Sequence, residues 1–269
     1  MPEIARTEGQ RAFGHDPAGY DHARLEYPPR IYDILRDRCG LRPGARTFEI
    51  GPGTGIATRH LLRLGAAPLI AVEPDERLAA FLAATIGQYT NNLEVKIATF
   101  EDVDLPSGWF ELGAAASVLH WLDEEATLRK TASILRSGGW WAMWWNVFGD
   151  PSQPNEFHAA TQSLFANLDR SPGNSSDGQP PFALDIDRRI DRLSSIDTFD
   201  NITNDIMRWT ETLDTDQVMK LYATFPSISR LHPAERQQFL EGLGIIADDK
   251  FGGRVTLFMV TPLYTAQRR

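Results

Sequence analysis

The chain has 269 residues, 42% of them hydrophobic, which is enough to bury the core of one large α/β domain with a modest cap. Its 27 basic and 36 acidic residues give a net charge of −9, which disfavours nucleic acid as a partner because a phosphate backbone is repelled. The one cysteine, Cys39, excludes an internal disulfide and a thiolate zinc cluster, and we expect no metal site.

The N-terminal residues 1–19 are polar and lack the apolar stretch of a signal peptide, so we expect them to form a mobile arm. No segment reaches the roughly 20 apolar residues that a bilayer crossing needs. We therefore expect a soluble cytoplasmic protein without a membrane partner, and the sequence leaves its oligomeric state open. A helical pattern follows over residues 20–39.

Strand and helix patterns alternate between residues 47 and 145. Apolar runs predict strands at 47–50, 69–72, 93–97, 112–118 and 140–145. Amphipathic patterns predict helices at 55–64, 75–86 and 124–135. Repeated βα units of this length predict an α/β fold with a Rossmann-like, doubly wound and mostly parallel sheet.

This alternation ends at residue 149. Two loops rich in Pro, Gly, Ser and Asn flank helical patterns, and we assign residues 149–198 to a helical cap insertion. A long strand at 198–212, helices at 214–223 and 233–242, and a final strand at 255–263 follow. We thus expect the core to comprise residues 20–148 and 199–269.

A glycine-rich turn joins the first strand to its helix. Gly51, Gly53 and Gly55 let the backbone turn sharply and approach a ligand without a Cβ in the way. Glu73 ends the second strand, where a carboxylate can accept hydrogen bonds from both hydroxyls of a ribose. Together these features predict a nucleoside-type ligand.

The glycine spacing distinguishes between two nucleoside-type ligands, a dinucleotide and S-adenosylmethionine. The dinucleotide fingerprint G-x-G-x-x-G requires a glycine where this chain has Ile56. S-adenosylmethionine has no phosphate, and the E-x-G-x-G-x-G spacing over residues 49–55 suits it better. An NAD-dependent oxidoreductase and a non-catalytic cofactor-binding module remain the alternatives.

Residues 49–55 resemble the first motif of class I methyltransferases, and Glu73 resembles the ribose-binding residue of that family. Residues 135–139 are similar to its L-x-x-G-G turn. Residues 20–28 and the pair at 120–121 resemble a small-molecule subgroup that includes the trans-aconitate type. The resemblance implies S-adenosylmethionine as the cofactor and a seven-stranded sheet whose last strand is antiparallel.

The resemblance also implies a set of residues around the cofactor. They are Tyr20, Arg24, Glu49, Gly51, Gly53, Gly55, Glu73, Pro74, Thr99, Phe100, Glu101, Ser117 and Trp121. Thr99 departs from the aspartate that often reaches the adenine amino group, and Glu111 replaces an aspartate at the start of the fourth strand. The N-P-P-Y type motif of enzymes that methylate amide or base nitrogens is absent.

The acceptor side is expected at the ends of the fourth and fifth strands, next to the cap. His120 is the candidate catalytic residue, either as a general base or as a group that orients the acceptor. Trp145 and Asn146 are candidate substrate contacts. The predicted function is methyl transfer by in-line displacement to an oxygen, of a carboxylate or hydroxyl, or to a nitrogen of a small molecule.

Overall fold

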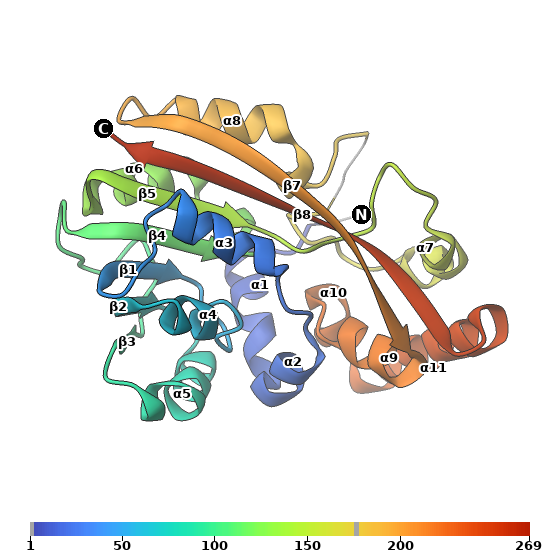
Figure 1. Ribbon diagram of the computed structural model, residues 1–269. Coiled ribbons are helices and arrows are strands. Elements are labelled where there is room, and N and C mark those ends of the chain that lie inside the picture. Colours follow the sequence, from blue (N-terminus) through green and yellow to red (C-terminus); the bar gives the residue numbers. More distant parts are fainter. Residues whose placement is uncertain (1–2, 175–177) are drawn as a thin grey trace.

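The computed structural model describes residues 3–174 and 178–269, in which one mixed sheet forms the centre (Figure 1). Its first five strands are parallel in the order β3-β2-β1-β4-β5, and β8 runs antiparallel to β5. The strands are β1 (Ala45–Ile50), β2 (Ala66–Val72), β3 (Leu93–Lys96), β4 (Phe110–Ala116), β5 (Leu135–Trp144), β6 (Val147–Phe148), β7 (Phe199–Asp214) and β8 (Arg254–Arg268). The expected Rossmann-like fold class is confirmed.

The sheet has eight strands in the described residues instead of seven, and the reason lies in β5 and β6. Trp144 pairs with Leu263, and Val147 pairs with Val260, so β6 continues the register of β5 on the same side of β8. A two-residue break at 145–146 separates them. The last strand in sequence, β8, is antiparallel as expected, but it lies inside the sheet because β7 pairs with its other side.

Helices cover both faces of this sheet. On one face, α3 (Pro29–Asp37) and α4 (Thr58–Arg63) bury Leu35 and Leu61 in a core that contains Trp144. On the other, α6 (Glu124–Ile134) and α8 (Ile186–Ser194) pack against a core that contains Trp141 and Met143. Successive strand side chains point to opposite faces, so the tryptophan-rich β5 supplies both cores.

A second group of helices lies where β7 and β8 extend together beyond the rest of the sheet (Figure 1). It comprises α7 (Glu156–Thr161), α9 (Thr215–Ala223), α10 (Pro226–Ser229) and α11 (Pro233–Phe251). Phe157 joins residues of the last two strands in a separate apolar core, whereas Leu193 and Ile196 pack on the sheet. The segment 149–198 therefore contributes to two different layers.

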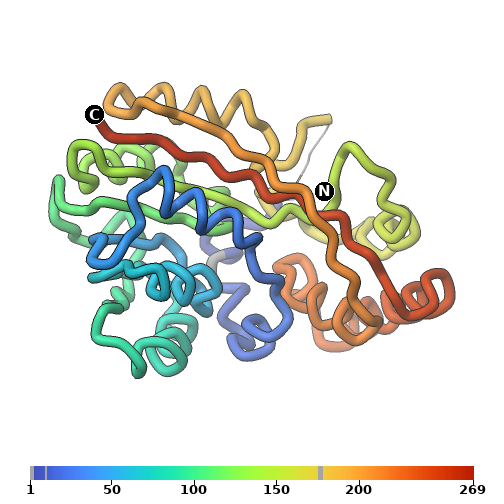
Figure 2. The backbone as a smooth tube through the Cα atoms, in the orientation of Figure 1, coloured from blue at the N-terminus to red at the C-terminus, as the bar shows by residue number. Residues whose placement is uncertain are grey.

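The N-terminal segment is folded, which differs from the mobile arm expected from its polarity. It forms α1 (Arg6–Ala12), a 3-10 turn at Phe13–His15 and α2 (Pro17–Ala23). Asp16 caps α2 by accepting the Gly19 N–H, and Ile4 is buried. This segment lies between α5 (Glu76–Thr85) and the C-terminal helices, as the blue tube in Figure 2 shows.

The helix expected over residues 20–39 is interrupted. α2 ends at Ala23, and α3 begins only at Pro29, because the two adjacent prolines lack the N–H groups that a continuous helix would need. The chain between them is extended at Arg24, which directs residues 24–28 across the carboxyl ends of the strands.

None of the helices in the described part of the chain combines the length and apolar character that a membrane crossing requires.

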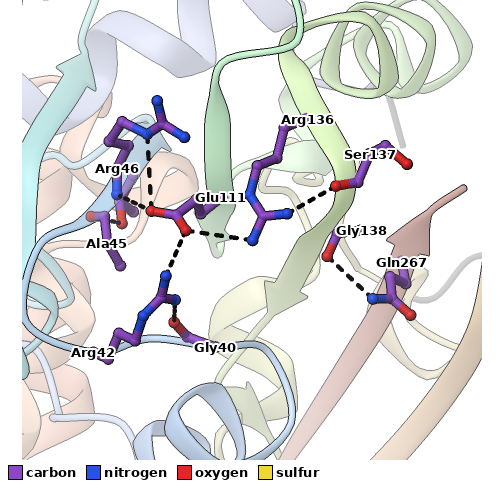
Figure 3. Close-up of polar contacts among 10 residues, drawn as sticks. Gly40, Arg42, Ala45, Arg46, Glu111, Arg136, Ser137, Gly138 and Gln267 are labelled. Carbon is purple, nitrogen blue, oxygen red and sulfur yellow. Dashed lines mark hydrogen bonds and ion pairs between the residues drawn. The ribbon is translucent and has the colours of Figure 1, made fainter.

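At the opposite end of the sheet, one carboxylate contacts three arginine residues. Glu111 at the start of β4 accepts hydrogen bonds from the guanidinium groups of Arg42 and Arg136, at 2.7 and 3.3 Å (Figure 3). It also accepts the backbone N–H of Arg46, whose guanidinium lies 3.8 Å away. These contacts join the starts of β1, β4 and β5.

Candidate cofactor site

A pocket lies at the carboxyl ends of the parallel strands, where this fold places ligands. β1, β2 and β4 supply its floor, and the N-terminal segment supplies part of its cover. Its walls are formed by Phe13, Tyr20, Tyr27, Ile50, Gly51, Pro52, Gly53, Thr54, Ile56, Ala57, Val72, Glu73, Pro74, Leu78, Thr99, Phe100, Glu101, Ala116, Ser117, Val118, Trp121 and Leu122. Ten of the thirteen residues expected around the cofactor line this pocket.

The glycine turn between β1 and α4 needs its glycines for two different reasons. All three glycines have left-handed φ angles, of 60°, 58° and 97°. A Cβ on Gly53 would meet nothing within 4 Å, so this residue faces open pocket space. A Cβ on Gly55 would lie 2.7 Å from Leu82, so Gly55 allows the turn to pack against α5 and does not itself line the pocket.

Glu73, at the end of β2, lies on the pocket wall and is only 4% exposed. One carboxylate oxygen accepts the Gly53 N–H at 3.1 Å, and the other accepts the Asp75 N–H at 3.0 Å. Each oxygen keeps a further lone pair for a ligand hydroxyl. Burial raises the pKa of Glu73 to about 7, against the lowering effect of these two backbone donors.

Glu49 lies beneath the glycine turn and is 1% exposed. One of its oxygens accepts a 2.7 Å hydrogen bond from Thr58, whereas Oε1 is buried without a hydrogen-bond partner in the described residues. Burial raises the pKa of Glu49 to about 7, and the negative charge of Glu73 acts in the same direction. Glu49 does not line the pocket, so its unpaired oxygen is a buried polar group beneath the turn, which is costly in the free protein.

The end of the pocket beyond Glu73 is mainly apolar. Leu78 and the buried Phe100 line it together with Thr99 and Glu101. The Thr99 hydroxyl donates to Asp102 at 2.8 Å and accepts the Asp102 N–H, so it closes a local turn. A flat heterocycle can bind between such apolar walls, and Thr99 replaces the usual aspartate without offering a free carboxylate.

At the other end of the pocket, next to β4, the lining includes both residues expected from the sequence and residues that were not expected. Ser117 and Trp121 line it as expected, and Tyr20 reaches it from α2. Phe13 and Tyr27 line it too, although neither was in the expected set. Tyr27 belongs to the motif at residues 20–28, which could have indicated it, whereas the sequence gives no local signal for Phe13.

His120 does not line this pocket. Its ring is enclosed by Trp121, Phe182 and Gly173, and its Nδ1 accepts a 3.1 Å hydrogen bond from the Trp145 indole N–H. Burial, with a smaller contribution from the charge of Arg24, lowers the pKa of His120 to about 3. A neutral imidazole in this position is poorly suited to accept a proton at neutral pH.

The two expected substrate residues are also turned to other partners. Trp145 is buried and occupied with His120. Asn146 donates to the backbone carbonyls of Leu25 and Glu26, and its side-chain oxygen accepts from Thr261. Asn146 therefore anchors the 24–28 segment to β8, and neither residue lines the pocket.

Arg24 lies next to the pocket without lining it. Its guanidinium is 4.9 Å from the ring centroids of both Tyr20 and Phe225, and it donates one hydrogen bond to the Thr224 carbonyl at 3.2 Å. Its Nε is buried without a partner, and no carboxylate pairs with it among residues 3–174 and 178–269. Arg24 thus joins the N-terminal segment to the C-terminal helices.

The pocket fits S-adenosylmethionine on the observations of this structure. The open position at Gly53 leaves room for the backbone-like methionine chain, and Glu73 offers acceptors for a ribose. The negative charges of Glu73, on the pocket wall, and of Glu49, beneath the glycine turn, favour a cofactor that carries positive charge. When bound, this cofactor supplies an electrophilic methyl group.

Comparisons with known proteins agree with this assignment. Residues 48–143 match a family described as a methyltransferase domain. An uncharacterized methyltransferase of Mycobacterium tuberculosis is 25% identical over 239 residues, which cover 84% of this chain and 91% of that protein. S-adenosylmethionine is therefore the cofactor of this chain.

Two further comparisons concern shorter or more distant likeness. Ribosomal RNA small subunit methyltransferase A of Rhodopseudomonas palustris is 49% identical over 60 residues, only 22% of this chain and 21% of that protein. The structure of the YcgJ protein of Bacillus subtilis has a TM-score of 0.58 at 13% identity and covers 90% of this chain and 99% of that chain. The latter likeness supports the fold.

Proposed function

We propose that this chain, an S-adenosylmethionine-dependent methyltransferase, methylates a carboxylate oxygen of a small, partly apolar molecule. The observation that carries this proposal is the guanidinium of Arg24, which lies beside the β4 end of the pocket without an anionic partner in the described residues. A partly buried cation that its own protein leaves unpaired is suited to an anionic ligand.

The surroundings of Arg24 favour an organic acid over a bare anion. Three aromatic rings surround the guanidinium, with Phe148 at 6.0 Å in addition to Tyr20 and Phe225. Aromatic walls provide an apolar surface for the rest of the acceptor, and the guanidinium provides a site for a carboxylate. The resemblance of residues 20–28 and 120–121 to the trans-aconitate type supports the same class of acceptor.

Two titratable side chains near the β4 end of the pocket, His120 and Tyr27, are poorly suited to act as a base, which supports a nucleophile that is already ionised. His120, the residue expected to act on a hydroxyl, has a pKa lowered to about 3 and is turned toward Trp145. Burial raises the pKa of Tyr27 above its ordinary value, so this phenol also stays protonated. A carboxylic acid ionises near pH 4 without help from the protein.

Methyl transfer to a carboxylate then requires mainly that the pocket align the acceptor oxygen with the methyl group. A carboxylate oxygen attacks the methyl carbon, the bond from carbon to sulfur breaks, and its electron pair stays on sulfur, which gives a methyl ester and a neutral thioether. Alignment of donor and nucleophile can supply about 7–11 kcal/mol of the barrier. Opposite charges are neutralised in this step, so an enclosed pocket with little water favours it.

A screen for S-adenosylhomocysteine release tests the acceptor class. Small carboxylic acids should support turnover, and their amide and alcohol analogues should not. The product should release methanol in mild alkali, as an ester does, whereas an ether or an N-methyl group would not. Turnover on alcohols, amines or RNA but on no carboxylic acid would overturn the proposal.

Arg24→Gln tests the residue itself. We expect KM for the acid to rise about tenfold or more, because a charge-assisted hydrogen bond is lost, with S-adenosylhomocysteine affinity unchanged. Arg129→Gln, which removes an exposed arginine paired with Glu125 on α6, is the matched control and should change neither quantity. If Arg24→Gln weakens S-adenosylhomocysteine but not methylthioadenosine, which lacks the amino acid, Arg24 binds the cofactor carboxylate instead.

A further inference from the structure

The order of residues along the pocket fixes which way the cofactor lies. Glu73 at the end of β2 is the ribose acceptor, and the apolar walls around Leu78 and Phe100 lie beyond it for the base. Because β1 lies between β2 and β4, a cofactor with its ribose at Glu73 would extend its methionine chain over the glycine turn toward β4. Residues 116–118 at the end of β4 would then lie next to its methyl group.

Ser117 has an unusual backbone conformation at this point. Its φ is +56°, in the left-handed region that few residues other than glycine adopt, and Asn201 is the other non-glycine residue with positive φ in the described chain. Such a conformation persists when its surroundings hold it, and it is common at functional sites. The Ser117 N–H donates to the Trp144 carbonyl at 2.8 Å, which ties the residue to β5.

Tyr27 holds the side chain of the same residue. Its hydroxyl lies 3.1 Å from the Ser117 Oγ and donates to it across 90 positions of sequence. Burial keeps the phenol protonated by raising its pKa, so it remains a donor. The Tyr27 ring packs edge-on against Trp144, 5.9 Å between centroids, so the same tryptophan holds both members of the pair.

We propose that Ser117 and Tyr27 form a hydroxyl pair that fixes the transferable methyl group: the Ser117 oxygen faces the methyl carbon, and Tyr27 is a positioning residue that acts through Ser117. The hydrogen bond from Tyr27 uses one lone pair of the Ser117 oxygen, so a second lone pair and the hydroxyl proton remain for a ligand in the pocket that Ser117 lines. A lone pair can contact the polarised C–H groups of a sulfonium methyl. This inference depends on the cofactor and is independent of the acceptor class.

The pair contributes to alignment more than to chemistry. A hydroxyl oxygen carries no net charge, so it orients the methyl group without neutralising the sulfonium that makes it reactive. Loss of either hydroxyl should leave the adenosine half of the site unchanged, since Glu73 and the apolar walls around Leu78 and Phe100 form that half. The effect should therefore be confined to ligands that place an atom where the methyl group lies.

Two cofactor analogues separate these possibilities without any acceptor. Sinefungin carries an amine-bearing carbon in place of the methyl-bearing sulfur, and S-adenosylhomocysteine has no group at that position. Calorimetric titration of Ser117→Ala should show sinefungin affinity about tenfold lower, because a charge-assisted hydrogen bond is lost, and S-adenosylhomocysteine affinity within twofold of the parent. Tyr27→Phe should show the same selectivity with a smaller loss.

The double variant and a matched control complete the test. Tyr27→Phe added to Ser117→Ala should cause no further loss, since Tyr27 acts through Ser117. Tyr32→Phe removes a buried hydroxyl of α3 that has no hydrogen-bond partner, and it should change the affinity for neither analogue. Equal weakening of both analogues, or of neither, would overturn the proposal. If Ser117→Ala does not fold, Tyr27→Phe alone decides between these outcomes.

Discussion

The carboxylates at the two ends of the sheet have different surroundings, and their pKa values are shifted in opposite directions. At the amino end, Glu111 is surrounded by the guanidinium groups of three arginines (Figure 3). Partial burial acts to raise the pKa of Glu111, but the hydrogen bonds and charges of its partners outweigh it and hold that pKa below its usual range. At the carboxyl end, burial raises the pKa values of Glu49 and Glu73 to about 7, and no arginine or lysine pairs with either in the described residues.

This difference separates a structural carboxylate from functional ones. The chain supplies the counter-charges of Glu111 itself, so this end of the sheet is complete without a ligand. At the other end, burial without a counter-charge from the chain costs stability in the free protein. A ligand that binds only the folded state offsets that cost.

The largest expected effect compares glycines at the two ends. Gly53→Val should lower S-adenosylmethionine affinity by more than a hundredfold, because a branched side chain would occupy pocket space at a left-handed residue. Gly44→Val is the control, since Gly44 also has a positive φ and open space around its Cβ but lies in a turn outside the pocket. Calorimetry should find normal binding for Gly44→Val; normal binding by a folded Gly53→Val would refute the placement of the loop.

The carboxylates themselves provide the next test. Glu73→Ala should weaken cofactor binding by about 1.5–3 kcal/mol with the fold retained, because a charged hydrogen-bond acceptor is lost. Glu111→Ala should bind the cofactor normally but lose about 1–2 kcal/mol of unfolding free energy, since three arginines lose their shared partner. Calorimetry measures cofactor affinity, and denaturant unfolding measures the free energy of unfolding. If both variants lost affinity and stability alike, the two ends of the sheet would not differ in role.

The pH dependence of binding sharpens the same contrast. Folding raises the pKa values of Glu49 and Glu73 from 4.5 to about 7, so the folded free protein binds more protons than the unfolded chain across that window and its stability falls as pH rises. A cationic cofactor favours the ionised carboxylates, so its affinity should rise about tenfold per carboxyl between pH 6 and pH 8. Neutral S-adenosylhomocysteine should show a weaker rise; a flat profile for both ligands would contradict the proposed charge pairing.

The smallest effect concerns the N-terminal cover. Hydrogen exchange across residues 12–27 should slow a few-fold when S-adenosylhomocysteine binds, because Phe13, Tyr20 and Tyr27 line the pocket. Exchange in β1 and β4 near Glu111 should change little and serves as the internal reference. Equal rates in the N-terminal segment with and without ligand would mean that it does not close over the cofactor.

The sequence by itself determined the parts of the site that depend on local chain geometry. The glycine turn and Glu73 follow from the order of βα units, because a strand end and the turn after it occupy a defined place in a parallel sheet, whereas Glu49 was expected from the resemblance to the family motif. The predicted strands differ from those in the structure mainly at their ends. The acidic residue that replaces aspartate at position 111 was visible too, but its three arginine partners come from separate segments.

Only the tertiary structure shows how the side chains near the ends of β4 and β5 are arranged. His120, Trp145 and Asn146 lie near the strand ends as expected, yet each side chain is turned toward a partner that local pattern cannot reveal. Tyr27 reaches Ser117 because Pro28 and Pro29 separate two helices and leave an extended segment across the strand ends. Contacts between residues so far apart depend on how helices and strands pack, and packing selects one side-chain orientation among several that the sequence allows equally.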